Sequence, residues 1–241
     1  MNDATYFFII KALNLLLWDG ELVGKENLGE GPAVFVANHL GAKGPVGVVC
    51  SMPVRLYPWI HHETINKELA PEYVRLDFVE KELKLSPPLS VIVSKIICRI
   101  SVPLLLSLNP VPVYYNRLGM EETFQQSLKL LFDHKYLFIT PEDPSLEPDR
   151  ITGIRPFMKG FIRLGELYAA TTNLRLPFYP LTVHESGLVI IDKPLLYNPN
   201  NDARKERLRL VNLLEMTIKA RYAQLCESYS LAPSFADKRN I

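Results

Sequence analysis

The sequence has few cysteines and almost no net charge, and each shortage excludes a class of protein. Its three cysteines, Cys50, Cys98 and Cys226, are odd in number and widely separated. This pattern argues against a disulfide framework or a zinc site and favours a reducing compartment with buried, unreactive thiols. Lysine and arginine total 27 against 26 acidic residues, a net charge of +1. No global basic field therefore favours nucleic acid as a partner, and any attraction to anionic lipid must be local.

Several common signatures are also missing. The chain contains neither a Gly-x-Ser-x-Gly nucleophile elbow nor a Gly-x-Gly-x-x-Gly dinucleotide motif. The stretch Gly20–Glu26 is one residue short of a phosphate-binding P-loop and lacks its Ser or Thr. No internal repeat or low-complexity linker divides the 241 residues, which suffice for one large core. We therefore expect one domain, residues 1–241.

The apolar stretch Tyr6–Trp18 predicts a helix within residues 1–19. It is too short to span a bilayer, which takes about 20 apolar residues, and it lacks the basic leader and cleavage site of a signal peptide. Lys11 and Asn14 share one helical face. The wide apolar remainder suits a membrane interface or the core equally well.

Beyond this helix, short apolar runs alternate with amphipathic segments. The runs predict strands at Ala33–Ala37, Val54–Ile60, Val111–Tyr115, Tyr136–Thr140, Leu176–Val183 and Leu188–Asp192. The segments predict helices from about Val46, over Glu121–Phe132 and Phe161–Ala170, and over residues 202–226, whose apolar stripe includes Leu208. The order predicts an α/β fold with a mixed, mostly parallel sheet, flanking helices and an apolar N-terminal helix.

The longest hydrophobic run is Leu85–Leu108. Ser86 is a candidate N-cap with two prolines in the first turn, and Lys95 and Arg99 share one face four residues apart. Two cations in mid-segment make a transmembrane helix costly, so a buried or interfacial helix is favoured. The cations either hold lipid phosphate or extend to water, and we favour the second.

Histidines follow two of the predicted strands. His39 stands after Ala33–Ala37, at the carboxyl edge where open α/β sheets bind ligands, but a histidine there can also simply hydrogen-bond the local backbone. The run His61-His62-Glu63 follows the next strand. Adjacent strand residues point to opposite faces and do not converge as metal ligands do, so this run predicts a solvated loop and no metal site.

Asn38-His39 resembles the first block of the glycerolipid acyltransferases (lysophosphatidic acid acyltransferase-like), in which Asp stands five residues after the His; here that residue is Gly44. Arg117 after a strand resembles their second block. The third block, Pro-Glu-Gly-Thr-Arg-Ser, is matched by Pro141 and Glu142, with Asp143 for the Gly and Ser145 for the Arg. Further likeness lies in Lys159-Gly160 before a helix and in a Pro-rich strand with Pro177 and Pro180.

The resemblance implies transfer of a fatty acyl group from a CoA or acyl-carrier thioester to the hydroxyl of a lysophospholipid or glycerol-phosphate-like acceptor. His39 and Glu142 are the implied catalytic residues, His39 as base and Glu142 as a binding or orienting group. The implied substrate-binding residues are Asn38, Arg117 as phosphate clamp, Pro141, Asp143, Lys159 and Gly160. No metal or cofactor is implied, and the expected location is peripheral, on the cytoplasmic face of a membrane.

Gly44 leaves two hypotheses open. An active enzyme would be weak, or would use Asp143 or Glu142 in place of the motif carboxylate, because the carboxylate orients the histidine and stabilises the imidazolium. The alternative is a catalytically impaired relative that binds lipid or acyl-CoA without turnover. A Gly44→Asp variant should raise acyl transfer if the missing carboxylate is the sole defect.

Overall fold

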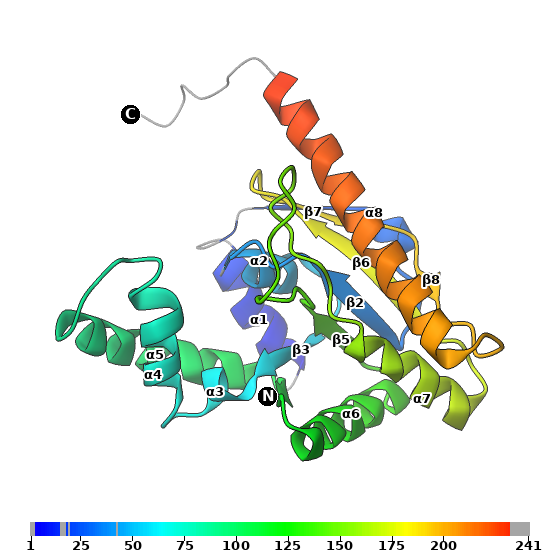
Figure 1. Ribbon diagram of the computed structural model, residues 1–241, viewed down its shortest axis with the longest axis horizontal. Helices are drawn as coiled ribbons and strands as arrows, with labels where there is room; N and C mark the ends of the chain where they lie inside the picture. The colour runs from blue at the N-terminus through cyan, green and yellow to red at the C-terminus, as the bar shows by residue number, and fades with distance from the viewer. Residues whose placement is uncertain (1–2, 15–17, 19, 42, 232–241) are drawn as a thin grey trace.

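The computed structural model describes residues 3–14, 18, 20–41 and 43–231, and their centre is one twisted sheet (Figure 1). The strands are β1 (Glu21–Val23), β2 (Ala33–Ala37), β3 (Leu56–His61), β4 (Val111–Val113), β5 (Tyr136–Ile139), β6 (Pro177–Val183), β7 (Leu188–Ile191) and β8 (Leu195–Leu196). Their order is β1-β7-β6-β2-β5-β3-β4, with β8 beside β6. Strands β7 and β8 run antiparallel to β6, and the other recorded pairs are parallel. The predicted mixed, mostly parallel sheet is confirmed.

Helices cover both faces of the sheet. They are α1 (Asp3–Leu13), α2 (Lys43–Ser51), α3 (His62–Ile65), α4 (Ala70–Val74), α5 (Leu89–Ser107), α6 (Arg117–Phe132), α7 (Arg163–Thr172) and α8 (Ala203–Leu231), with short turns η2 (Lys25–Asn27), η3 (Arg75–Val79) and η4 (Gly160–Ile162). Alternation along β2 sets the layers: Val34 and Val36 join the core under α6, α7 and α8, whereas Phe35 joins the core under α1 and α2.

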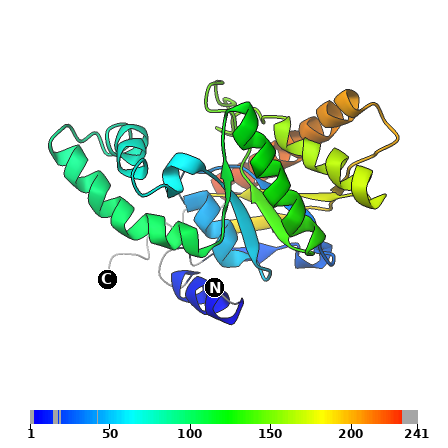
Figure 2. The ribbon, with the colours of Figure 1, turned by 90° about the horizontal axis from the view of Figure 1, so that it is seen from below.

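Residues 62–107 form a helical arm beyond the β3–β4 side of the sheet, as Figures 1 and 2 show. The arm consists of α3, α4, η3 and α5. It has its own small cluster of buried apolar residues, Ala70, Cys98 and Val102. The two large cores described above do not include it.

Three local predictions were wrong. Helix α5 begins at Leu89 rather than near Ser86. Ser86 and Pro87 each precede a proline, and a residue before proline is disfavoured in the helical region of backbone conformations. The run at His61 is not a solvated loop: His61 ends β3 and His62 begins α3. On α8, Leu208 is exposed, and Leu210 is buried instead.

The N-terminal helix uses both of its apolar faces. On one, Tyr6 and Ile10 are buried in the core, and Arg55 lies over the Tyr6 ring while pairing with Asp3 at 2.8 Å. On the other, Phe7 and Phe8 are exposed. The predicted helix ends at Leu13, and residues 15–17 lie outside the described part of the chain. Within the described residues, α5 and not α1 is long and apolar enough to cross a membrane.

Candidate active site

The carboxyl ends of β2 and β5 bring the first and third sequence blocks together. These strands are parallel neighbours in a register that pairs Val36 with Ile139, so the residues that follow them lie side by side. Asn38 is buried after β2, and its side-chain amide donates to the Val183 carbonyl at 2.9 Å and accepts from the Val183 amide at 2.8 Å. Both groups of Asn38 are thus occupied by β6. Asn38 fixes the turn before His39, and we assign it no contact with substrate.

Glu142 holds the turn from the other side. Its Oε1 accepts a hydrogen bond from the His39 backbone amide at 2.6 Å, and its Oε2 accepts one from the Arg155 amide at 2.9 Å. A short antiparallel bridge between Glu142 and Phe157 keeps the loop after β5 in place. One carboxylate therefore joins three segments that are distant in sequence. As a residue His39 is exposed at this edge, although the surrounding protein desolvates part of its ring.

The remaining third-block residues serve the backbone of this loop. Pro141 is buried, and its carbonyl accepts from the Met158 amide at 2.8 Å. Asp143 accepts from the Ser145 hydroxyl at 2.6 Å and from the Ser145 amide at 3.0 Å, and these bonds hold the pKa of Asp143 below its usual range. The described contacts of both residues stabilise the loop. Their assignment to substrate binding therefore gains no support from the structure.

Lys159 and Gly160 lie exposed at the start of η4, which leads into α7. An added Cβ at Gly160 would meet no atom within 4 Å, so the backbone there is open to solvent. No hydrogen bond of the Lys159 side chain is recorded within the described residues. An anion-binding role for the pair stays a prediction.

The protein surrounding His39 lowers the pKa of its imidazole below the usual value, because desolvation disfavours the charged form. The carboxylates of Glu142 and Asp77 act in the opposite direction and with smaller effect. The ring is therefore neutral at pH 7, which is the protonation state that a general base needs. Within the described residues, no side chain makes a recorded hydrogen bond to this ring.

Gly44 stands in the first turn of α2, and its amide donates to the Leu40 carbonyl at 3.2 Å. A Cβ at this position would lie 2.8 Å from the His39 carbonyl oxygen and 3.0 Å from its carbonyl carbon. The β-carbon of any other residue would therefore press on the backbone that carries the imidazole. Neither Asp143 nor Glu142 replaces the motif carboxylate at the ring, because their described bonds go elsewhere.

Arg117 lies on the same edge but not beside His39. It is exposed at the first position of α6, after β4, where Asn116 caps the helix by accepting from the Gly119 amide at 2.8 Å. Strands β5 and β3 separate β2 from β4. At about 4.8 Å per strand, the two strand ends are about 14 Å apart. The structure therefore does not bring Arg117 and His39 into contact, and the phosphate clamp stays a prediction.

Two histidines and three tyrosines lie at this edge between His39 and Arg117, and the sequence did not predict this grouping. The rings lie 5.1 Å apart for His61 and Tyr73, 5.1 Å for His61 and Tyr115, and 4.7 Å for His62 and Tyr114. The Nδ1 atoms of His61 and His62 are buried without a recorded hydrogen bond. Burial, and the neighbouring His62, lower the pKa of His61, so its imidazole is neutral near pH 7. The sequence carried a signal for this grouping, because aromatic rings stand at the end of β3, in His61 and His62, and directly after β4, in Tyr114 and Tyr115.

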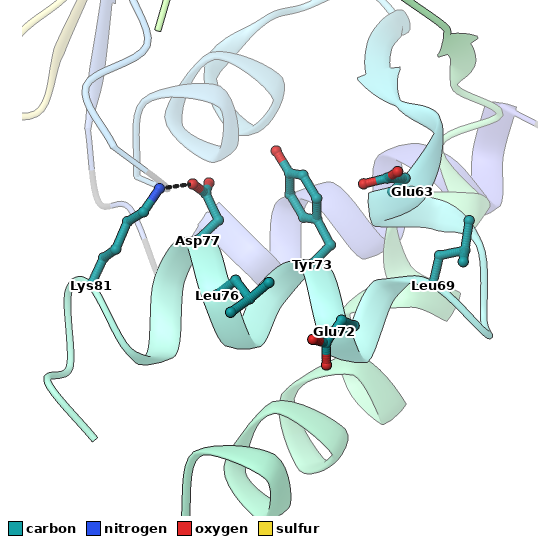
Figure 3. Close-up of a pocket in the computed structure, with 7 residues that line it drawn as sticks. All are labelled: Glu63, Leu69, Glu72, Tyr73, Leu76, Asp77 and Lys81. Carbon is teal, nitrogen blue, oxygen red and sulfur yellow. Dashed lines mark hydrogen bonds and ion pairs between the residues drawn. The ribbon is translucent and has the colours of Figure 1, made fainter. Parts of the chain in front are cut away.

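The arm carries a shallow pocket of about 290 Å³, lined by Glu63, Leu69, Glu72, Tyr73, Leu76, Asp77 and Lys81 (Figure 3). The Tyr73 ring lies between Asp77 and Glu63, and Asp77 pairs with Lys81 at 2.7 Å (Figure 3). Three carboxylates with one ammonium group that is already paired do not attract an anion. We therefore do not assign the acceptor phosphate to this pocket.

Comparison with solved structures identifies the fold. The chain is similar to the crystal structure of the 1-acyl-sn-glycerophosphate (LPA) acyltransferase PlsC from Thermotoga maritima, with a TM-score of 0.55 over 92% of this chain and 78% of that one. The two share a fold. Sequence identity is 14%, so the likeness extends to the fold alone. No protein-family model and no curated protein sequence matches the chain.

In this acyltransferase-like fold, the edge formed by β2, β5, β3 and β4 presents a neutral imidazole at His39 and a guanidinium at Arg117. Such a pair can accept a proton at one end and hold an anion at the other. Within the described residues, no group of three or more His, Cys, Asp or Glu side chains is arranged to hold a metal ion.

Proposed function

We propose that the protein is an acyltransferase that moves a fatty acyl group from a CoA or acyl-carrier thioester to the hydroxyl of a lysophospholipid or glycerol-phosphate-like acceptor. One observation carries the proposal: the Glu142 carboxylate fixes the backbone of His39, a neutral histidine, at the ligand-binding edge of the sheet. The fold that the chain shares with an acyltransferase supports it. We place the enzyme on the cytoplasmic face of a membrane as a peripheral protein.

His39 acts as the general base. Its neutral imidazole takes the proton of the acceptor hydroxyl while the hydroxyl oxygen attacks the thioester carbonyl carbon, and a tetrahedral oxyanion forms. When this intermediate collapses, the carbon–sulfur bond breaks and the imidazolium returns the proton to the leaving thiolate. The ester, the free thiol and the neutral imidazole balance the reaction without a further reactant.

The acceptor lies along the edge from β2 toward β4. Its hydroxyl meets His39, its phosphate binds the guanidinium of Arg117 in a two-pronged contact, and the space between is bordered by the His61 and Tyr115 rings. The third-block Arg is absent here, since Ser145 occupies that position. A single clamp predicts weaker discrimination among phosphate-bearing acceptors.

Gly44 favours the alternative, a relative that binds lipid or acyl-CoA without turnover. No carboxylate among the described residues makes a recorded hydrogen bond to the His39 ring. A histidine base without an orienting carboxylate still catalyses the reaction, but slowly. General-base catalysis contributes about 10²–10⁴ in rate, and the orientation of the imidazole governs how much of this factor is realised. We rank the slow enzyme first because Glu142 still holds the His39 backbone.

The test is incubation of the purified protein with labelled acyl-CoA, and separately with labelled acyl-carrier protein, against a panel of lysophospholipids and glycerol phosphate. We expect labelled ester with at least one pair, and loss of that product in His39→Ala. His134→Ala is the matched control, because His134 is exposed at the end of α6, on the loop that leads into β5. Binding of acyl-CoA without product would favour the non-catalytic alternative. Product formation by His39→Ala at the wild-type rate would remove His39 from the mechanism.

A further inference from the structure

Helix α5 has its hydrophobic face turned away from the protein. Leu89, Ile92, Ile96 and Ile100 are 51%, 54%, 58% and 70% exposed. At 100° per residue these four positions fall on one face, a stripe about 17 Å long at 1.5 Å per residue. We call them the α5 stripe. A surface helix of a water-soluble protein normally shows the opposite arrangement.

The buried face of α5 consists of small and partly polar residues. Ser90, Ser94, Cys98 and Val102 face the protein at intervals of four. The Ser90 hydroxyl donates to Glu80 Oε1 at 2.9 Å, and Arg75 pairs with the same oxygen at 2.6 Å. The rest of the arm therefore holds α5 through the Ser90–Glu80 hydrogen bond and the small cluster of Ala70, Cys98 and Val102, and the aliphatic face is left without a partner among the described residues.

Two cations border the stripe. Lys95 and Arg99 are exposed and lie one helical turn apart on the flank next to Ile92 and Ile96. Neither side chain has a recorded acidic partner within the described residues. An aliphatic face flanked by free cations matches the boundary between acyl chains and anionic headgroups.

We propose that the α5 stripe is the surface through which this protein docks on an anionic lipid bilayer, with α5 parallel to the membrane plane. The α5 stripe enters the acyl-chain region, and Lys95 and Arg99 bind headgroup phosphates. The inference rests on the proposed function for its biological purpose, which is access to membrane-borne substrates, and it names the surface that provides this access.

Two other occupants fit less well. A second copy packed stripe to stripe would bring together cations from two helices, and α5 contains no Asp or Glu to pair with them. A membrane-spanning α5 would carry Lys95 and Arg99 into the bilayer interior. A spanning α5 would also have to separate from the rest of the arm or carry the arm's charged residues Glu72, Arg75 and Asp77 into the bilayer.

The experiment measures sedimentation of the full chain with vesicles of phosphatidylcholine and with vesicles containing equal parts phosphatidylcholine and phosphatidylglycerol. The double variant Ile96→Glu/Ile100→Glu should bind both vesicles at least tenfold more weakly than wild type. The matched control is Leu208→Glu/Met216→Glu, which alters two exposed apolar residues on α8, 52% and 66% exposed, and should bind as wild type does. Lys95→Gln/Arg99→Gln should lose about thirtyfold on the anionic vesicles and little on the neutral ones.

Four results would overturn the proposal. The first is a wild-type protein that does not bind vesicles, and the second is a stripe variant that binds as well as wild type. The third is a wild-type protein that is a dimer by light scattering while the stripe variant is a monomer. The fourth is membrane-bound protein that alkaline carbonate does not extract. Circular dichroism and the melting temperature verify folding. If the stripe variant fails to fold, Ile100→Trp replaces it: brominated lipid should quench its added fluorescence strongly and that of Met216→Trp little. Equal quenching of the two would contradict docking through α5.

Activity separates this proposal from the proposed function. The stripe variant should retain acyl transfer between water-soluble short-chain substrates, because α5 is outside the His39 edge. His39→Ala should lose that transfer and still sediment with anionic vesicles. Failure of the enzyme and failure of the docking surface therefore give different results.

Discussion

The Oε1 atom of Glu142 accepts a hydrogen bond from the backbone amide of His39 at 2.6 Å, so the residue after β5 fixes the backbone of the residue after β2. The second oxygen of the same carboxylate accepts from the Arg155 amide. Both acceptors are needed, since each oxygen faces an N–H group. Glu142 thus holds the main chain that carries the imidazole, and its charge acts on the pKa of the ring without a recorded hydrogen bond to it among the described residues.

Glu142→Gln should lower both stability and turnover. The glutamine nitrogen must face one of the two N–H groups, leaving a donor opposite a donor, which costs about 1–3 kcal/mol. The shifted His39 should reduce kcat about ten- to a hundredfold. Urea unfolding and steady-state kinetics measure the two effects. Glu147→Gln, an exposed acid in the same loop, should change neither; an unaltered Glu142→Gln would show that the hydrogen bonds to His39 and Arg155 are dispensable.

Gly44→Asp should impair the protein, whereas the sequence predicted a gain in acyl transfer if the missing carboxylate were the sole defect. The obstacle is space, because the new Cβ would lie 2.8 Å from the His39 carbonyl oxygen. We expect a loss of about 1–3 kcal/mol in stability and lower acyl transfer. Gly44→Ala adds the same Cβ without the carboxylate and is the matched control. An aspartate variant at least tenfold more active than the alanine variant would restore the hypothesis that a missing carboxylate limits the enzyme.

Arg117→Ala should raise the KM for a phosphate-bearing acceptor about tenfold or more, since a charge-assisted hydrogen bond contributes about 1.5–3 kcal/mol. The melting temperature should stay the same, because Arg117 is exposed and makes no recorded hydrogen bond or ion pair within the described residues. Arg150→Ala, another exposed arginine, should leave the KM unaltered. Equal KM values for phosphate-bearing and neutral acceptors in the wild type would argue against the clamp.

Acyl transfer should be insensitive to pH just above 7 and should fall as the solution is acidified. Desolvation lowers the pKa of His39, so the ring stays neutral until the pH drops below the usual histidine value of about 6.5. A profile of kcat/KM against pH should therefore show its acidic limb below that value. An acidic limb well above pH 7 would indicate that another group is the base.

Glu206 should make the fold sensitive to strong acid. It is buried, and hydrogen bonds from Arg209, Asn201 and the Asn198 amide lower its pKa to about 2. Because this pKa is depressed, the stabilisation is present above the unfolded value and is lost as the pH falls through about 4.5 toward 2. Glu206→Gln should lower the free energy of unfolding by about 2 kcal/mol at neutral pH, a figure reduced from the full pKa shift because solvent screens the exposed Arg209. Urea unfolding at neutral and acidic pH tests this, and a difference that does not shrink on acidification would contradict it.

Much of the fold was readable in the sequence because its signals are local. Ala33–Ala37 is a strand with the predicted bounds, since Val and Phe favour strands and Gly31-Pro32 ends the preceding segment. The hairpin of β6 and β7 follows from two apolar runs around Ser186-Gly187. The short helical elements of the arm were missed, because α3, α4 and η3 are four or five residues long, too short for a helical period to be recognised.

The sequence by itself determined that His39, Arg117 and Glu142 each follow a strand, and parallel strands end at one edge. Only the tertiary structure decided that Glu142 binds the backbone of His39 and that the side-chain amide of Asn38 is hydrogen-bonded to the Val183 backbone. It also decided that Gly44 has no room for a side chain. The exposure of the aliphatic face of α5 to solvent was likewise decided by the tertiary structure and not by the sequence pattern. Hydrophobic period fixes which residues share a face of a helix or strand. Which neighbour covers that face depends on contacts between segments far apart in the chain, and no local pattern records them.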